Sequence, residues 1–221
     1  MNTIVVEEQT LVIPTWVHDH ASFRRWARSE DFPETGCVCY LRKGTWIDMS
    51  KEQLFTHNQV KHEYAFTLTG IIRRAKQGRY FPDGVLLSND DADLTAQPDG
   101  VFVSYESLDV GRIRLIEGTQ DGFVELEGSP EMVLEVVSRS SIVKDTVTLM
   151  EQYWQAGIEE YWLVDVRGRK LEFDIFRRGT KGYVEARKQS GWIKSDVFGK
   201  SFRLTRSSDD QGHPVFTLHV K

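Results

Sequence analysis

The sequence predicts an α/β protein in which a mixed β-sheet is flanked by helices. Helical patterns alternate with short apolar segments, and one such segment, Met132–Val137, has the β-branched character of a strand buried on both faces. A composition of 40% hydrophobic and 28% charged residues is ordinary for a globular protein. The 221 residues suffice for one sizeable core or two small ones, and we expect a single domain over 1–221.

The N-terminal half is expected to contain a long helix. Ser50 is a good N-cap, and Gln53, three residues later, completes a capping-box pattern. This pattern predicts a helix that runs from Ser50 to about Lys76. The elements before it are a short helix and a hairpin, expected over 18–28, 37–41 and 45–49.

The C-terminal half is expected to be mainly strands with one helix. The helix runs from Ser141 to Ala156, and Gly157 follows it as a residue suited to a left-handed end. The segment 178–221 forms a basic, β-rich extension whose last part, from Trp192, has no assigned elements. Strands are expected over 84–88, 100–104, 132–137, 161–166, 170–176 and 183–186.

Two carboxylates suggest a metal site. Glu135 lies inside a buried strand, where a carboxylate is costly unless it is paired, hydrogen-bonded or bound to a metal. Asp99 directly precedes the apolar strand residues Val101 and Val103. If these two strands pair, both carboxylates can point at one spot that suits Mg²⁺ or Mn²⁺. Alternatively, Asp99 forms the turn before Gly100, and Glu135 is a charge that protects an edge strand.

A longer pattern surrounds these acids. Pro98-Asp99 is followed by the segment GSPEMVLEVVS at 128–138, by Tyr153, and by AGIEEYWLVD at 156–165. Together with WIDM at 46–49 and the helix that opens with His57, this pattern resembles the Uma2 (DUF820) family. That family belongs to the PD-(D/E)XK restriction endonuclease-like superfamily, and the resemblance covers roughly 37–177.

The resemblance implies a restriction endonuclease-like fold, with extra strands at both ends of the chain, and a Mg²⁺- or Mn²⁺-dependent DNA endonuclease. Asp99 and Glu135 match the family's metal ligands. Related folds add a helical glutamate, for which Glu63 is the candidate, although a solvated helix face is the alternative explanation of that residue. Three further positions match the family pattern, namely His57, Ser138 and Asp145.

The expected lysine is absent from both places where the patterns put it. The superfamily position is Val137, and the Uma2 position in the following helix is Leu149. In an α-helix Lys144 would lie ~140° from the Leu149 face, and Gln152 would lie ~60° from it. Lys144 and Gln152 are the candidate replacements, so the catalytic candidates are Asp99, Glu135, Lys144 and Gln152.

Three functions are therefore compatible with the sequence. The first is a DNA phosphodiesterase of the Uma2 type whose activity is weakened. The second is a catalytically inactive protein that binds nucleic acid or metal and has kept the acids without the lysine. The third is a hydrolase with a carboxylate pair, such as a glycosidase, which would need an aromatic cleft that the sequence does not locate.

Charge and termini set expectations for partners and location. The net charge is −5, but 167–206 holds 12 Lys/Arg and 4 Asp/Glu, which is +8 and leaves −13 for the remainder. Such a segment can hold a polyanion, and the alternative is a set of hairpins with solvated lysines. We expect DNA as substrate or ligand, no membrane, and a homodimer as one form of assembly. MNTIVVEEQT lacks the features of a signal peptide, so the cytoplasm is the expected location.

Overall fold

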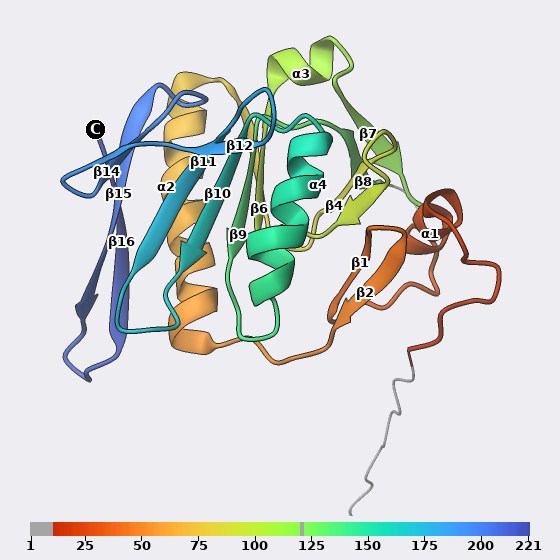
Figure 1. Ribbon diagram of the computed structural model, residues 1–221, viewed down its shortest axis with the longest axis horizontal. Coiled ribbons are helices and arrows are strands. Elements are labelled where there is room, and N and C mark those ends of the chain that lie inside the picture. The colour runs from red at the N-terminus through yellow and green to blue at the C-terminus, as the bar shows by residue number, and fades with distance from the viewer. Residues whose placement is uncertain (1–10, 120–121) are drawn as a thin grey trace, which may run out of the picture.

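The computed structural model, which describes residues 11–119 and 122–221, is a mixed α/β protein with three sheets (Figure 1). This confirms the expected fold class, although the strands are divided among three sheets where one was expected. Residues 1–10, expected to lack a signal peptide, lie outside the described residues. Among those described, no helix has both the length and the apolar character needed to span a membrane.

The central sheet has six strands in the order β12-β11-β10-β9-β6-β3. β9 and β10 are parallel, and the other neighbours are antiparallel. Five of its six strands overlap the strands predicted from the apolar runs, because such runs are a strong local signal, whereas β3 was not predicted. They are β3 (Gly78–Pro82), β6 (Gly100–Ser104), β9 (Met132–Val136), β10 (Glu160–Asp165), β11 (Glu172–Arg178) and β12 (Tyr183–Glu185).

Two helices cover opposite faces of this sheet. Helix α2 (Gln59–Ala75) presents Tyr64 and Leu68 to a core that includes Leu134 and Trp162. Helix α4 (Leu149–Gln155) packs Tyr153 into a second core on the other face. Each helix is preceded by a π-helical turn, η1 (Leu54–Asn58) before α2 and η2 (Lys144–Thr148) before α4.

The other two sheets extend the fold at its two sides (Figure 1). The order β2-β1-β5-β4-β8-β7 includes the predicted N-terminal hairpin, against which α1 (His20–Ala27) packs Phe23 and Trp26. The order β13-β14-β15-β16 covers α2, since Phe216 and Leu218 join the core beneath that helix. Their strands are β1 (Cys37–Leu41), β2 (Gly44–Asp48), β4 (Leu86–Asn89), β5 (Leu94–Ala96), β7 (Ile113–Glu117), β8 (Phe123–Gly128), β13 (Lys188–Gln189), β14 (Trp192–Ser195), β15 (Lys200–Ser208) and β16 (Pro214–Val220), and a short helix α3 (Tyr105–Asp109) follows β6.

The predicted capping box before α2 is wrong. The Ser50 N–H donates to Asp48 Oδ1 at 2.8 Å, and Gln53 makes no side-chain bond to the helix start. The helical region therefore begins at Leu54, and residues 50–53 form a non-helical segment. At the other predicted helix end, Gly157 does adopt the left-handed conformation, with φ of 79°.

Candidate active site

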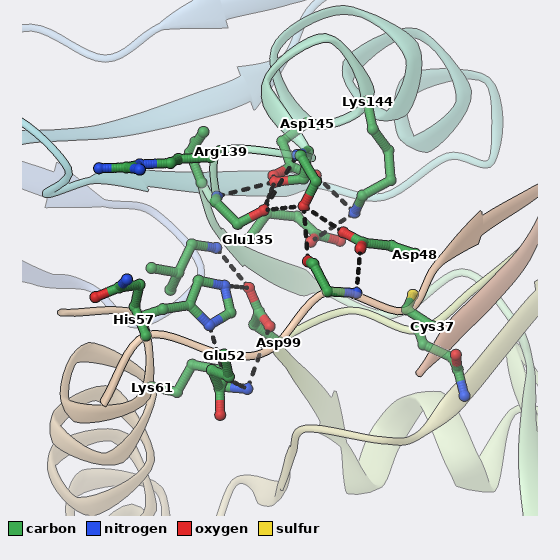
Figure 2. Close-up of a pocket in the computed structure, with 18 of the residues that line it drawn as sticks. Cys37, Asp48, Glu52, His57, Lys61, Asp99, Glu135, Arg139, Lys144 and Asp145 are labelled. Atoms are coloured by element: carbon green, nitrogen blue, oxygen red, sulfur yellow. Dashed lines mark hydrogen bonds and ion pairs between the residues drawn. The ribbon is translucent and has the colours of Figure 1, made fainter. Parts of the chain in front are cut away.

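The pairing of β6 with β9 brings the two predicted acids together. Gly100 pairs with Leu134 in an antiparallel register, so Asp99, just before β6, lies opposite Glu135, the next residue of β9. The Val136 N–H donates to Asp99 Oδ2 at 2.7 Å, which fixes the orientation of that carboxylate. The juxtaposition expected from the sequence is thus present at the end of the central sheet (Figure 2).

The acids lie in a cavity of about 530 Å³ between the N-terminal ends of the two covering helices. The segment 50–53 and the loop after β9 form part of its wall. Asp99 and Glu135 line the cavity together with several other charged side chains, which are Asp48, Lys51, Glu52, His57, Lys61, Asp83, Arg139, Lys144, Asp145 and Arg167.

Glu135 is buried and bonded on both carboxylate oxygens. The Tyr153 hydroxyl donates to Oε1 at 2.7 Å, and Lys144 Nζ lies 3.4 Å from Oε2. Burial raises the pKa of Glu135 well above its usual value, because desolvation outweighs the attraction of Lys144. A cation that approached this carboxylate would lower its pKa again.

The π-helical turn η2 explains how Lys144 reaches Glu135. The Leu149 N–H donates to the Lys144 carbonyl, five residues earlier, so Leu149 follows Lys144 on the same side of the helix. In a regular α-helix Lys144 would point ~140° away from that side. The turn thus supplies a buried cation on the face where the family pattern expects a lysine, and π-helical turns are frequent at functional sites.

Lys144 is shared between two carboxylates. Its Nζ lies 2.6 Å from Asp145 Oδ1, and it also lies 5.2 Å from the ring centre of Trp46. Burial alone would lower the pKa of Lys144, but Glu135 and Asp145 outweigh that effect and raise it well above its usual value. Lys144 is therefore protonated at neutral pH.

Asp99 faces a second group of cations, which come from η1 and α2. His57 Nε2 lies 3.5 Å from Asp99 Oδ2, and Lys61 Nζ lies 3.8 Å from Oδ1. Burial alone would lower the pKa of His57, but Asp99 and Glu52 raise it to about 9. Glu52 accepts from His57 at 2.7 Å and also pairs with Lys61, and these partners outweigh burial and lower the pKa of Glu52 to about 2.

Lys61 and Glu52 were not predicted from the sequence. Lys61 lies four residues after His57, a spacing that puts two helical side chains on one face, so the spacing was a usable signal. Glu52 gave no such signal, because the sequence pattern placed it inside a helix. The loop after β9 was also only partly anticipated: Ser138 exchanges hydrogen bonds with Ser141, and Ser140 donates to Asp48 at 2.5 Å.

The structure does not bring Gln152 or Glu63 into this cluster. Gln152 Nε2 donates to the Ala92 carbonyl at 3.4 Å, on the core side of α4. Glu63 Oε1 accepts from the Leu218 N–H at 2.7 Å, which joins α2 to β16. Neither side chain lines the cavity, so Lys144 is the candidate replacement that the fold places at the acids.

The donor set fits a hydrated divalent cation. Within 11–119 and 122–221, no group of three or more His, Cys, Asp or Glu side chains is arranged to hold a metal ion. Mg²⁺ commonly uses only one or two carboxylates and keeps several waters, so Asp99 and Glu135 are sufficient in number and are of the right hard-oxygen type.

The mixed sheet, its two covering helices and the acids at the end of β6 and β9 define a restriction endonuclease-like protein. The chain belongs to the Uma2 family, whose model, described as "Putative restriction endonuclease", matches residues 22–207. This match extends beyond 37–177 at both ends. The crystal structure of a putative nuclease belonging to DUF820 from Anabaena variabilis has a similar fold, with a TM-score of 0.57 and 13% identity over 82% of this chain and 90% of that chain. No curated protein matches the chain.

Proposed function

We propose that this protein is a metal-dependent nuclease that hydrolyses phosphodiester bonds in DNA. Asp99 and Glu135 would hold Mg²⁺ or Mn²⁺, and Lys144 would stand in for the family lysine. The observation that carries this proposal is the position of Lys144, whose Nζ reaches the Glu135 carboxylate because η2 is a π-helical turn. The family description and the nuclease-like fold support the same reaction class.

Phosphodiester hydrolysis needs positive charge near the phosphate, because negative charge develops there in the transition state. Lys144 is protonated and largely buried, so its charge acts in a medium of low dielectric, where it is worth more than in water. The bound metal ion would polarise the phosphate and lower the pKa of an attacking water. The Val136 N–H and the Tyr153 hydroxyl keep Asp99 and Glu135 in fixed orientations.

One observation favours the alternative, a protein that binds nucleic acid or metal without cleaving. Lys144 is closer to Asp145 than to Glu135, at 2.6 Å against 3.4 Å. A lysine held in this ion pair is partly neutralised and would give a phosphate less stabilisation. Catalysis would then be weak or absent while the acids still bound a cation.

Nicking of supercoiled plasmid DNA tests the proposal. The wild-type protein should nick with Mg²⁺ or Mn²⁺ and stop when EDTA is added, and Asp99→Asn, purified identically, should be inactive. The matched control is Asp83→Asn, which removes an exposed carboxylate from the cavity wall without touching the acid pair. If titration calorimetry shows that the protein binds Mn²⁺ but no nicking occurs at any Mg²⁺ or Mn²⁺ concentration, the nuclease proposal is wrong and the alternative, a protein that binds without cleaving, holds.

A further inference from the structure

A second concave site lies in the C-terminal sheet, and its lining is basic. The cavity has a volume of about 530 Å³. Four of its eight lining residues are cations, and the described lining contains no aspartate or glutamate. It is lined by Arg177, Arg187, Gln189, Ser190, Trp192, Lys194, Ser201 and Lys221. The basic segment 167–206, with its net charge of +8, thus contributes three of its cations, Arg177, Arg187 and Lys194, to one cavity.

Two of these cations are available to a ligand. Within the described part of the chain, Arg187 and Lys194 take part in no ion pair within 4.0 Å, and both are exposed. Arg177 is different, because its guanidinium pairs with Asp196 at 3.0 Å and donates to the Lys194 carbonyl at 2.5 Å. Arg177 therefore braces the backbone of β14, from which Lys194 extends into solvent.

Trp192 gives the basic pocket a fixed wall. Lys221 Nζ lies 4.2 Å from the centre of its ring, and the Arg203 guanidinium lies 4.8 Å from it. Such cation–π contacts hold the two cations beside the pocket without neutralising their charge. Main-chain bonds between Ser201 and Lys221, at 2.9 and 3.0 Å, fix the backbone that carries one of them.

The basic pocket is separate from the acidic cavity. Arg177 is aligned with Glu160 and Met132 across the central sheet, whereas Glu135 is aligned with Leu163 and Asp174. Arg177 and Glu135 are therefore three residues apart along the strands and two strands apart across them, which is about 10 Å in each direction. Figure 1 shows α2 beginning at the bottom of the view, at the end that lines the acidic cavity, and β14 beside its upper half.

We propose that the basic pocket binds the phosphodiester backbone of DNA, with Arg187 and Lys194 as the cations that contact phosphate. The choice of DNA as occupant rests on the proposed nuclease function, but the binding itself needs neither metal nor catalysis. Contacts to phosphate through lysine and arginine release counterions, so this binding is independent of sequence and weakens with salt. The separation of the two sites means that a strand must be several nucleotides long to occupy both.

Fluorescence anisotropy with a short labelled DNA duplex in EDTA tests this binding without cleavage. The affinity of the wild-type protein should fall at least tenfold between about 50 and 200 mM salt. The double variant Arg187→Ala/Lys194→Ala should bind about tenfold more weakly at low salt, and its slope of log affinity against log salt should be shallower by about 1.8, the value for two lost phosphate contacts.

The matched control is Lys170→Ala/Lys181→Ala, which removes the same charge from the same segment at exposed positions outside the pocket. It should bind like the wild type. Equal losses of DNA affinity in the two double variants would show that binding depends on the overall positive charge of the segment and not on the pocket. Wild-type affinity in Arg187→Ala/Lys194→Ala would show that the pocket does not bind DNA. A wild-type protein that does not bind at low salt also overturns the inference, whatever the nicking assay shows. Conversely, loss of nicking with intact DNA binding would overturn the nuclease alone.

Discussion

The backbone N–H of Leu149 bonds to the carbonyl of Lys144, five residues earlier, and this i→i+5 bond brings Lys144 to the helix side of Leu149, the position at which the family pattern has a lysine. Leu149 itself is fully buried in the core beneath α4. On this side of the helix, Lys144 thus provides the positive charge and Leu149, one turn later, provides the apolar contact. Five predictions about the acidic cavity and its neighbouring residues can be measured.

Replacing Lys144 with methionine should abolish metal-dependent nicking while keeping a similar side-chain length. A positioned cation acting on the transition state is worth about 10²–10³ in rate. The variant should also lose about 3–5 kcal/mol of folding free energy at neutral pH, because Glu135 and Asp145 are left buried without their partner. Plasmid nicking and thermal melting measure the two effects. Lys51→Met, on the exposed rim of the same cavity, is the control and should change neither.

Introducing a lysine at the family position by Leu149→Lys should not raise activity. The charge would enter an apolar core next to the existing Lys144, and the cost should be at least about 3 kcal/mol. We expect a clearly lower melting temperature and nicking no faster than wild type. A variant that melts normally and cleaves faster would show that Lys144 does not fill the lysine's role.

Removing the Tyr153 hydroxyl by Tyr153→Phe should destabilise the protein by about 1–3 kcal/mol, because a buried carboxylate oxygen loses its donor. Mn²⁺ affinity should change as well, since Glu135 is no longer held in one orientation. Melting and titration calorimetry provide the two readouts. Tyr105→Phe, at an exposed tyrosine, is the control, and an unchanged melting temperature in Tyr153→Phe would contradict the bond.

Mn²⁺ affinity should depend on Glu135 and on pH. Glu135→Gln should weaken binding, and equal affinity in wild type and variant would remove Glu135 from the metal site. The pKa of Glu135 is raised by burial, so protons compete with the metal at higher pH than for an ordinary carboxylate. Wild-type affinity should therefore decrease as pH falls through that raised pKa, and calorimetry at several pH values will show whether it does.

The metal-free protein should lose stability at alkaline pH through His57. Its pKa is raised from 6.5 to about 9 in the folded state. Protonated His57 therefore stabilises the folded protein fully at pH values below 6.5, its pKa in the unfolded chain. This stabilisation, about 3 kcal/mol, is lost as the pH rises through about 9. Melting in EDTA should show this loss in wild type, and His57→Gln should flatten it. The same slope in both proteins would assign the effect to another group.

Local pattern was enough to predict the acid pair and the strands that carry it. Asp99 precedes one apolar run and Glu135 interrupts another, and short β-branched apolar runs of this kind are typical of strands buried on both faces. The sequence left the pairing of these two strands as a condition, and the structure pairs them with Gly100 opposite Leu134, so that Asp99 and Glu135 lie on adjacent strands and line the same cavity. The same local reasoning left β13–β16 unassigned, although Phe216-Thr217-Leu218-His219-Val220 alternates apolar and polar residues. These strands bury their apolar side chains by packing on α2, a long-range contact that the sequence does not show.

The sequence by itself determined that this chain is a mixed α/β protein with Asp99 at the start of one apolar strand and Glu135 inside another, because hydrophobic period and burial can be read from consecutive residues. Only the tertiary structure decided that these two strands are neighbours, and which cations face those acids. Lys144 reaches Glu135 through a π-helical turn, and Lys61 reaches Asp99 from a separate helix. An i→i+5 backbone hydrogen bond cannot be recognised from the pattern of apolar residues. An ion pair between elements that are distant in the sequence forms only when the core packs those elements together.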